Sequence, residues 1–284
     1  MQIERVAVIG AGTMGHGIAQ VASMAGQQVQ LFDLDAQVVE RALARVRSNL
    51  DKGVERGKVD AASRDAAVAR LGGGADLARA CRDADIVIEA VPERLDLKQD
   101  LFRKVAALVR ADCVLATNTS SLSIARIARA VPHPGRVVGT HFFNPVHIMA
   151  LLELVHHDGT DPAVLARVKA WGEALGKTCI VVRDSPGFAT SRLGVCLGME
   201  AIRMLQEGVA SAEDIDQAMV LGYRHPVGPL RLTDMVGLDV RMQIGEYLAR
   251  ELGNAAFEPP ELMRRMVAEG KLGQKTGQGF YRWP

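Results

Sequence analysis

The sequence predicts an α/β protein in which a doubly wound, Rossmann-type parallel sheet is followed by an all-α domain. Over residues 1–184, short runs rich in Val and Ile alternate with stretches of helical periodicity, which is typical of βαβ units. Over residues 185–284 the strand-like runs stop, and only helical patterns remain. We therefore expect two domains, 1–184 and 185–284. The second is expected to complete a cleft or to form a dimer.

The strands of the first domain are predicted from short β-rich segments. Several are continuous Val and Ile runs, as expected for strands that helices cover on both faces. The stretch Asp35–Val59 is predicted as a helix, because apolar residues such as Val39 and Leu43 recur three to four apart on one face. The expected strands are Arg5–Ile9, Val29–Asp33, Asp85–Val91, Cys113–Thr117, Arg136–Phe142 and Thr178–Arg183.

The second domain begins at the tetrapeptide Asp184–Gly187, whose Asp-Ser-Pro-Gly sequence predicts a turn and a hinge. Ser211 is expected to cap a helix, with Asp214 three residues on in a capping-box-like arrangement. The expected helices are Phe188–Gln206, the helix that starts at Ser211, Asp234–Leu252 and Pro260–Glu269.

Composition excludes several classes of protein. The 284 residues are 48% hydrophobic and 24% charged, which is typical of a globular chain that buries its own core. The formal net charge of +1 gives no broad basic field for nucleic acid or an anionic membrane. No apolar run reaches the roughly 18 residues that span a bilayer, and a strand starts within a few residues of the N-terminus, which leaves no room for a signal peptide. We expect a cytoplasmic protein.

The cysteines favour the same compartment. None lies in a C-x-x-C pair, and metal ligands do not cluster near them, so no metal site is expected. We expect buried free thiols in a reducing environment at Cys81, Cys113, Cys179 and Cys196.

A dinucleotide site is predicted where the first strand runs into a Gly-Ala-Gly-Thr-Met-Gly loop. Gly10 permits the tight turn, Gly12 lets the backbone approach a pyrophosphate, and Gly15 lets the next helix pack against the strand. The N-terminus of that helix presents backbone N–H groups to the phosphates. The expected cofactor contacts of the loop are Gly10, Gly12, Thr13, Met14 and Gly15.

Asp33 selects the form of the cofactor. It ends the second expected strand, 23 positions after Gly10, where a carboxylate accepts hydrogen bonds from an adenosine ribose and repels a 2′-phosphate. NAD is therefore expected in preference to NADP. Asp35 lies nearby and is expected to cap the following helix instead.

Two polar segments lie where strands of the expected sheet end, Asn118–Leu122 and His141–Pro145. A neutral histidine suits proton removal near pH 7, and Glu153, twelve residues after His141, could fix its tautomer. A buried structural role for His141 is the alternative. Among the other histidines His147 is the strongest rival, and His156 and His157 are expected to be solvated.

Segments spread over the whole chain, in order, resemble the short-chain 3-hydroxyacyl-CoA dehydrogenases, and above all those that act on 3-hydroxybutyryl-CoA. The turn Ser-Pro-Gly-Phe beside His-Phe-Phe-Asn-Pro is particularly specific. The matching segments are the glycine loop, Val-Pro-Glu at 91–93, 118–122, 141–145, 184–188 and 275–281.

The resemblance assigns roles to individual residues. It implies that His141 is the catalytic base, that Glu153 orients it, and that Ser120 contacts the substrate and the nicotinamide region. It also implies an acyl-CoA substrate. A homodimer is expected for another reason: the predicted helices of the second domain present more apolar faces than one small layer can bury. Further cofactor contacts implied by the resemblance are Glu93, Lys98, Asn144 and, more weakly, Lys275. The nearest candidates to hold the CoA are Asn49, Lys52 and Arg56, for which a solvated helix face is the alternative.

One position departs from the family pattern. The family has Asn one residue before the Arg of Gly-Phe-x-x-Asn-Arg, and this chain has Ser191 there. A serine hydroxyl can still donate a hydrogen bond to the substrate, with less reach. Two other functions stay open: a related dehydrogenase of free acids, of the L-gulonate type, and a recruited crystallin-like protein without catalysis. The acyl length, the direction and the pathway are not predicted.

Overall fold

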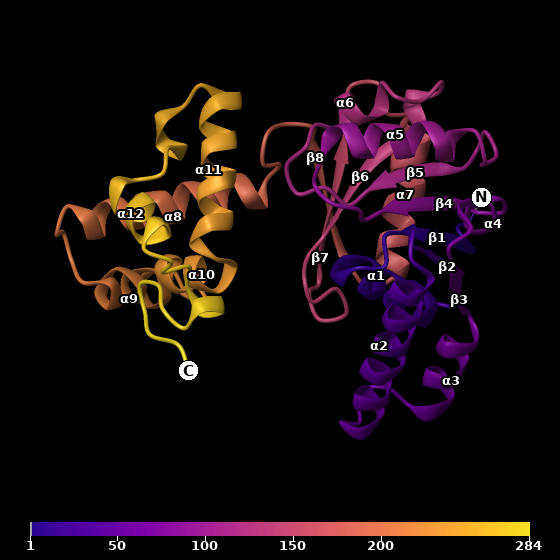
Figure 1. The fold of residues 1–284 in the computed structure, drawn as a ribbon, viewed down its shortest axis with the longest axis horizontal. Helices are drawn as coiled ribbons and strands as arrows, with labels where there is room; N and C mark the ends of the chain where they lie inside the picture. Colours follow the sequence, from indigo (N-terminus) through magenta and orange to yellow (C-terminus); the bar gives the residue numbers. More distant parts are fainter. Residues whose placement is uncertain (1) are drawn as a thin grey trace. The chain divides into compact units, whose positions relative to one another are not determined.

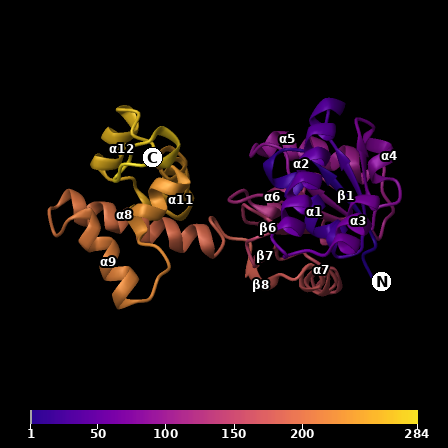
Figure 2. The same cartoon turned by 90° about the horizontal axis from the view of Figure 1, so that it is seen from below.

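The structure is a computed structural model that describes residues 2–284, and it divides into two compact units, Met1–Asp184 and Ser185–Pro284. Figures 1 and 2 show a twisted sheet flanked by helices in the first unit and helices alone in the second. No helix in the described part of the chain is long and apolar enough to cross a membrane.

The first unit is built on one eight-stranded sheet with the order β3-β2-β1-β4-β5-β6-β7-β8. The expected sheet is confirmed as mostly parallel, and the exception is β7, which pairs antiparallel with β6 and parallel with β8. The chain order reverses between β1 and β4, where open α/β sheets place their ligands. The strands are β1 Arg5–Ile9, β2 Gln28–Phe32, β3 Leu71–Gly74, β4 Ile86–Glu89, β5 Val114–Thr117, β6 Val137–Phe142, β7 Leu151–His156 and β8 Thr178–Arg183.

Helices cover both faces of the sheet (Figure 1), as the continuous apolar strands predict. The expected helix after β2 is confirmed as α2, although it ends at Glu55 and not at Val59. Asp35 caps it, because its Oδ1 accepts a hydrogen bond from Gln37 N at 2.8 Å. The helices are α1 Thr13–Met24, α2 Ala36–Glu55, α3 Ala61–Ala69, α4 Leu77–Cys81, α5 Leu95–Ala106, α6 Ile124–Ala128 and α7 Pro162–Ala174, with a 3₁₀ turn at Pro134–Arg136.

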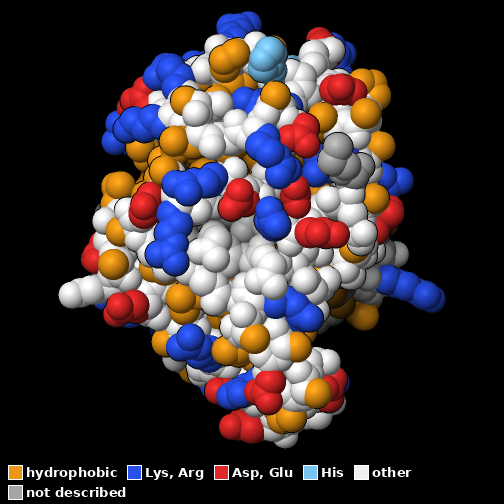
Figure 3. All heavy atoms as spheres, turned by 90° about the vertical axis from the view of Figure 1, so that its right-hand side faces the viewer, with side chains coloured by type: hydrophobic (Ala, Val, Ile, Leu, Met, Phe, Trp, Pro, Cys, Tyr) orange, Lys and Arg blue, Asp and Glu red, His pale blue; other side chains and the backbone are white. Residues whose placement is uncertain are grey.

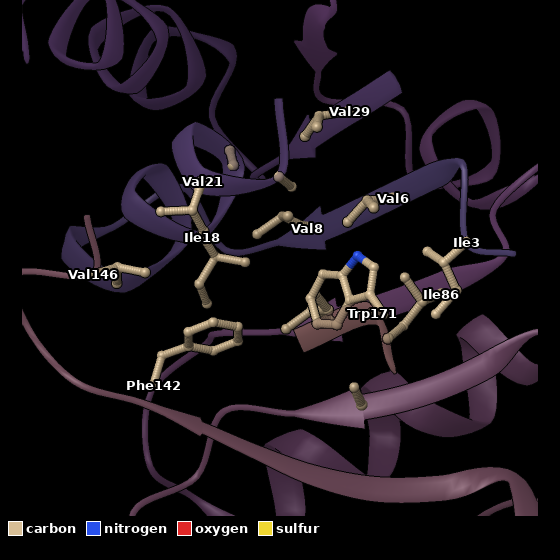
Figure 4. Close-up of a cluster of buried hydrophobic side chains, with 14 of the residues drawn as sticks. Ile3, Val6, Val8, Ile18, Val21, Val29, Ile86, Phe142, Val146 and Trp171 are labelled. Atoms are coloured by element: carbon tan, nitrogen blue, oxygen red, sulfur yellow. The ribbon is translucent and has the colours of Figure 1, made fainter. Parts of the chain in front are cut away.

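The core of the first unit lies between α1, α7 and the sheet (Figure 4). Ile18 of α1 faces Phe142 at the end of β6, and the Phe142 and Trp171 rings meet edge to face, with centroids 6.2 Å apart. Each such side chain, fully buried, contributes about 1.5–3 kcal/mol. This core therefore fixes α1, and with it the glycine loop, against the strand that carries His141.

The surface of the first unit carries both signs of charge. Figure 3 views one face of it, on which Lys and Arg side chains are interspersed with Asp and Glu, as the net charge of +1 predicts. The four cysteines are free as expected, but only Cys81 and Cys113 are buried, whereas Cys179 and Cys196 are half-buried. The expectation for His157 was wrong, because its ring is buried and lies 3.1 Å from Pro134 O.

The second unit is helical, and no strand occurs among its described residues 185–284. Ser211 caps α9 as expected, since its Oγ accepts a hydrogen bond from Asp214 N at 3.1 Å. The single helix expected over Asp234–Leu252 was wrong: the chain breaks at Gly237, whose φ of 104° a helix cannot contain. The helices are α8 Thr190–Gln206, α9 Ala212–Gly222, α10 Pro229–Val236, α11 Leu238–Leu252 and α12 Glu261–Ala268, with 3₁₀ turns at Ala255–Phe257 and Gln274–Thr276.

Candidate active site

The glycine loop has the geometry of a phosphate cradle. Gly10 has a φ of +102°, and a Cβ on Gly15 would lie 1.7 Å from the carbonyl oxygen of Gly10, so neither position admits a side chain. A Cβ on Gly12 would meet nothing within 4 Å, so this glycine leaves the backbone approachable from outside. No side chain of the described residues caps α1, which leaves its N-terminal N–H groups to an anionic ligand.

Asp33 follows β2 and lies against this loop. Its Oδ2 accepts a hydrogen bond from Ala11 N at 2.8 Å, and its Oδ1 accepts one from Leu34 N at 2.8 Å. The carboxylate is thus fixed beside the glycine loop while the residue stays half-exposed. Loop and carboxylate together fit the pyrophosphate and the adenosine ribose of a dinucleotide.

His141 and Glu153 form a buried pair across two strands. The antiparallel register of β6 and β7 sets them directly opposite each other. His141 Nδ1 lies 2.7 Å from Glu153 Oε2, with side chains 7% and 0% exposed. A carboxylate on Nδ1 keeps the proton of a neutral imidazole on that nitrogen, so Nε2 carries the lone pair and can act as a base. The Phe143 ring packs on His141, with centroids 4.4 Å apart.

Ser120 lies in a loop that Glu93 organises. One oxygen of Glu93, Oε1, accepts hydrogen bonds from the Thr119 hydroxyl at 2.5 Å, from Ser120 N at 2.9 Å and from Ser121 N at 3.2 Å. Ser120 itself is exposed in the loop that follows β5. The carboxylate therefore sets the backbone of the loop and leaves the Ser120 side chain at the surface.

Asn118 has a role that sequence reasoning missed. Its Oδ1 accepts a hydrogen bond from Phe142 N at 2.9 Å, which ties the end of β5 to the residue after His141. The motif Asn118–Leu122 marks this position in the sequence, yet only the pairing of β5 with β6 shows what the amide reaches. The glycine loop, Asp33, Ser120 and His141 all follow the carboxyl ends of their strands or lie at them, and so share one edge of the sheet.

Three further residues were predicted for the site. Asn144 is exposed in the loop after β6. Ser191 is half-buried on the first turn of α8, and Lys275 is exposed; both belong to the second unit. Lys275 Nζ lies 2.6 Å from both carboxylate oxygens of Asp239, so this lysine has an anionic partner within its own unit.

A cationic cavity of about 1000 Å³ opens beside α2. The three residues predicted to hold CoA all line it, and none of its described lining residues is acidic. Sequence reasoning missed the cationic contribution of Lys58 and Lys177. Burial lowers the pKa of His147 in the wall, and His16 and Lys177 lower it further. The titratable and amide residues of the lining are Gln20, Asn49, Lys52, Arg56, Lys58, His147 and Lys177.

Lys177 fixes one wall of the cavity. Its Nζ donates hydrogen bonds to the carbonyl oxygens of Val146 and Met149, the latter at 2.8 Å, and so holds the segment that carries His147. Burial lowers the pKa of Lys177. The sequence carries no signal for this role, because the accepting carbonyls lie far from Lys177 along the chain.

The fold and the glycine loop together are those of a dinucleotide-dependent dehydrogenase. No group of three or more potential metal ligands occurs in residues 2–284. Residues 5–185 match the family described as 3-hydroxyacyl-CoA dehydrogenase, NAD binding domain, and residues 187–283 match the C-terminal domain of the same family. The chain belongs to the 3-hydroxyacyl-CoA dehydrogenase family, and the resemblance noted from its motifs is confirmed.

Individual relatives resemble the chain over its whole length. It is 41% identical to a 3-hydroxybutyryl-CoA dehydrogenase of Mycobacterium tuberculosis, covering 99% of each chain. It is 40% identical to a 3-hydroxybutyryl-CoA dehydrogenase of Bradyrhizobium diazoefficiens, covering 98% of this chain and 95% of that one. The crystal structure of the (S)-3-hydroxybutyryl-CoA dehydrogenase PaaH1 from Ralstonia eutropha superposes with a TM-score of 0.96 at 41% identity, covering both chains fully.

Proposed function

We propose that this chain oxidises the 3-hydroxyl of short (S)-3-hydroxyacyl-CoA molecules with NAD, and that 3-hydroxybutyryl-CoA is its preferred substrate. The observation that carries the proposal is the buried His141–Glu153 pair, 2.7 Å apart, on the sheet edge that also holds the glycine loop. The names of the relatives support the acyl length.

His141 takes the hydroxyl proton on Nε2, and Glu153 stabilises the imidazolium that forms. When bound, NAD⁺ supplies the acceptor for the hydride that leaves C3. Ser120 orients the substrate oxygens from its loop. Gly10–Gly15 and Asp33 hold the cofactor, with Glu93, Lys98, Asn144 and Lys275 as further candidates. Ser191 donates to the thioester oxygen in place of the family asparagine.

The cavity beside α2 supports CoA over a free acid as the substrate. Its cationic side chains face no carboxylate in the described lining, and a ligand with several phosphates is what such a surface attracts. We therefore assign Asn49, Lys52 and Arg56 to the nucleotide end of CoA.

The decisive experiment follows NADH formation at 340 nm with 3-hydroxyacyl-CoA substrates of increasing chain length. We expect the highest kcat/KM for the four-carbon substrate. Free 3-hydroxybutyrate and L-gulonate are the control substrates. The double variant Lys52→Ala, Arg56→Ala should raise KM for the acyl-CoA and leave KM for NAD unchanged. Oxidation of the free acids with no activity on any acyl-CoA would contradict the proposal.

We also propose a cytoplasmic homodimer joined through the second unit. Large apolar side chains of this unit are exposed, among them Leu193, which is 72% exposed, together with Leu221, Met235 and Val236. Such surfaces are typical of subunit interfaces. Free thiols are typical of a reducing compartment. Sedimentation should give the mass of a dimer, and a monomer at micromolar concentration would contradict the assembly.

A further inference from the structure

The first half of the loop that carries Ser120 is organised by Glu93. Its Oε1 accepts hydrogen bonds from Ser120 N at 2.9 Å and from Ser121 N at 3.2 Å. Its Oε2 lies 3.3 Å from the ammonium of Lys98, whose side chain is 0% exposed. Glu93 therefore orients the backbone of the two serines. Beyond Ser121, a different carboxylate holds the loop.

That carboxylate belongs to Asp184. Its Oδ2 accepts hydrogen bonds from the hydroxyl of Ser123 and from Ala125 N, both at 2.8 Å. Ser123 also caps α6, because its Oγ accepts a hydrogen bond from Arg126 N at 3.3 Å. The two donors lie 61 and 59 positions before Asp184 along the chain, so the fold alone brings them to this carboxylate.

The helix that follows the loop is too short to set its own starting point. α6 spans five residues, Ile124–Ala128, and a single helical turn is unstable by itself because it fixes several residues for few hydrogen bonds. Ile124 and Ile127 are 0% exposed, and Ile124 packs over Gly139 of β6. Apolar burial has no preferred direction, whereas a hydrogen bond has one. Asp184 therefore fixes where the first turn of α6 begins.

Asp184 is itself held by the sheet. It follows β8 directly, and its N–H donates a hydrogen bond to His156 O at 2.7 Å, which continues the parallel pairing of β8 with β7. It is also the last residue of the first unit. One carboxylate thus joins the end of the Ser120 loop to the strand end from which the chain leaves the first unit.

We propose that Asp184 is a positioning residue for Ser120, because it fixes the downstream end of the loop whose upstream part Glu93 holds. This inference rests on the proposed function, in which Ser120 orients the substrate oxygens, and deepens it. A misplacement of about 1 Å can cost on the order of 10² in rate, so release of the downstream end lowers kcat.

The first test compares two substitutions of the carboxylate. Asp184→Ala removes both acceptors and should lower kcat by about tenfold. Asp184→Asn keeps an oxygen that can accept both hydrogen bonds, so its kcat should stay within threefold of the wild type. Asp158→Ala is the matched control, because Asp158 is an exposed carboxylate that pairs with Arg183, the neighbour of Asp184. Wild-type kcat in Asp184→Ala, or an equal loss in Asp158→Ala, would overturn the proposal.

A graded variant covers the case in which Asp184→Ala does not fold. Ser123→Ala removes one of the two donors and leaves Ala125 N in place, so it should lower kcat by about threefold. The Kd for NADH, measured by fluorescence, should change less than threefold in either variant, since the glycine loop and Asp33 are untouched. Wild-type kcat in Ser123→Ala, or a rise in Kd that accounts for the whole loss of kcat/KM, would overturn the proposal.

The second test asks whether Asp184 acts through Ser120. If it does, the kcat of Ser120→Ala and that of the double variant Ser120→Ala, Asp184→Ala should agree within twofold, because the loop then has no serine left to position. A merely structural role for Asp184 would lower kcat by the same factor whether or not Ser120 is present. Losses that multiply in the double variant would therefore overturn the inference.

The third test does not depend on turnover. In Asp184→Ala, hydrogen exchange should be at least tenfold faster at the Ala125 amide and at least threefold faster at the Ser121 amide, because the loop is released from its downstream end. Asp158→Ala should leave both unchanged. Faster exchange confined to Ala125 would overturn the inference. A wild-type enzyme that is inactive on every acyl-CoA would contradict only the proposed function, so the two failures are distinguishable.

Discussion

A carboxylate pairs with a nitrogen-containing side chain at each edge of the sheet, but the two pairs have different roles. At the amino edge, Asp85 accepts hydrogen bonds from Glu4 N and Arg5 N at 2.9 Å and from Arg110, whose side chain is 45% exposed. At the carboxyl edge, the His141–Glu153 pair is almost fully buried. The Asp85 side chain is 15% exposed and its arginine partner 45%, so water reaches this pair and hardly reaches the His141–Glu153 pair. A carboxylate beside water can hold strands together, whereas one without water can also fix the protonation state of its partner.

The largest expected effect lies at the carboxyl edge. His141→Gln should lower kcat by on the order of 10²–10⁴, because a positioned base contributes that much, and should leave NADH binding nearly intact. Glu153→Gln should act in the same direction through the imidazole. Steady-state kinetics with 3-hydroxybutyryl-CoA and NADH fluorescence measure the two quantities. His147→Gln is the control, and a greater loss of kcat there would show that the base has been misassigned.

An intermediate effect is expected at Asp33, on the same edge but in contact with solvent. Asp33→Asn keeps an acceptor for Ala11 N and removes the negative charge. The preference for NAD over NADP, measured as a ratio of kcat/KM values, should fall roughly tenfold, which corresponds to about 1.4 kcal/mol of lost repulsion. A wild-type enzyme that prefers NADP would disprove the assignment of Asp33 altogether.

The smallest effect is expected at the amino edge. Hydrogen bonds from Glu4 N, Arg5 N and Arg110 hold the pKa of Asp85 below its usual value, although burial works against them. A lowered folded-state pKa means that the carboxylate stabilises the fold above pH ~4, and that this stability is lost as the pH falls through the lowered value. Asp85→Asn should therefore cost about 1 kcal/mol at pH 7, and less below pH ~4.

Urea unfolding at pH 7 and below pH ~4 measures the loss of unfolding free energy in Asp85→Asn. The kcat of this variant should stay within twofold of the wild type. A large loss of kcat in Asp85→Asn would remove the contrast between the two edges. A cost in stability that does not depend on pH would assign the effect to packing and not to the charge.

The sequence was informative wherever a strand is a run of large apolar residues, and all six expected strands occur. It did not predict β3, because Leu71–Gly74 contains three glycines, which are poor strand formers. It did not predict β7 either, so it missed both the strand Leu151–His156 and its reversed direction, which depends on how the preceding loop returns. The break at Gly237 was missed because the apolar pattern continues on both sides of the glycine.

Motifs located the candidate site better than they described its internal structure. His141, Glu153 and Ser120 stand in short, recognisable segments. Lys98 reads as an ordinary polar residue of an amphipathic helix, and only the fold shows that its ammonium is buried between Glu89 and Glu93. Lys177 is a similar case. Its partners are backbone carbonyls, which every residue carries, so the types of the partner residues do not reveal the contact.

The proposed base keeps its carboxylate partner only as long as β6 and β7 stay paired. Glu153 reaches His141 only while this ladder is closed, and β7 lies just inside β8, the last strand at that edge of the sheet. Each transient opening of the ladder would separate carboxylate from imidazole, and the ring could then exchange its proton between the two nitrogens. The fraction of molecules ready for turnover at any moment is thus governed by the free energy of separating β6 from β7. A substitution in β8, which pairs with the other side of β7, can therefore slow the reaction without altering any group that touches the substrate.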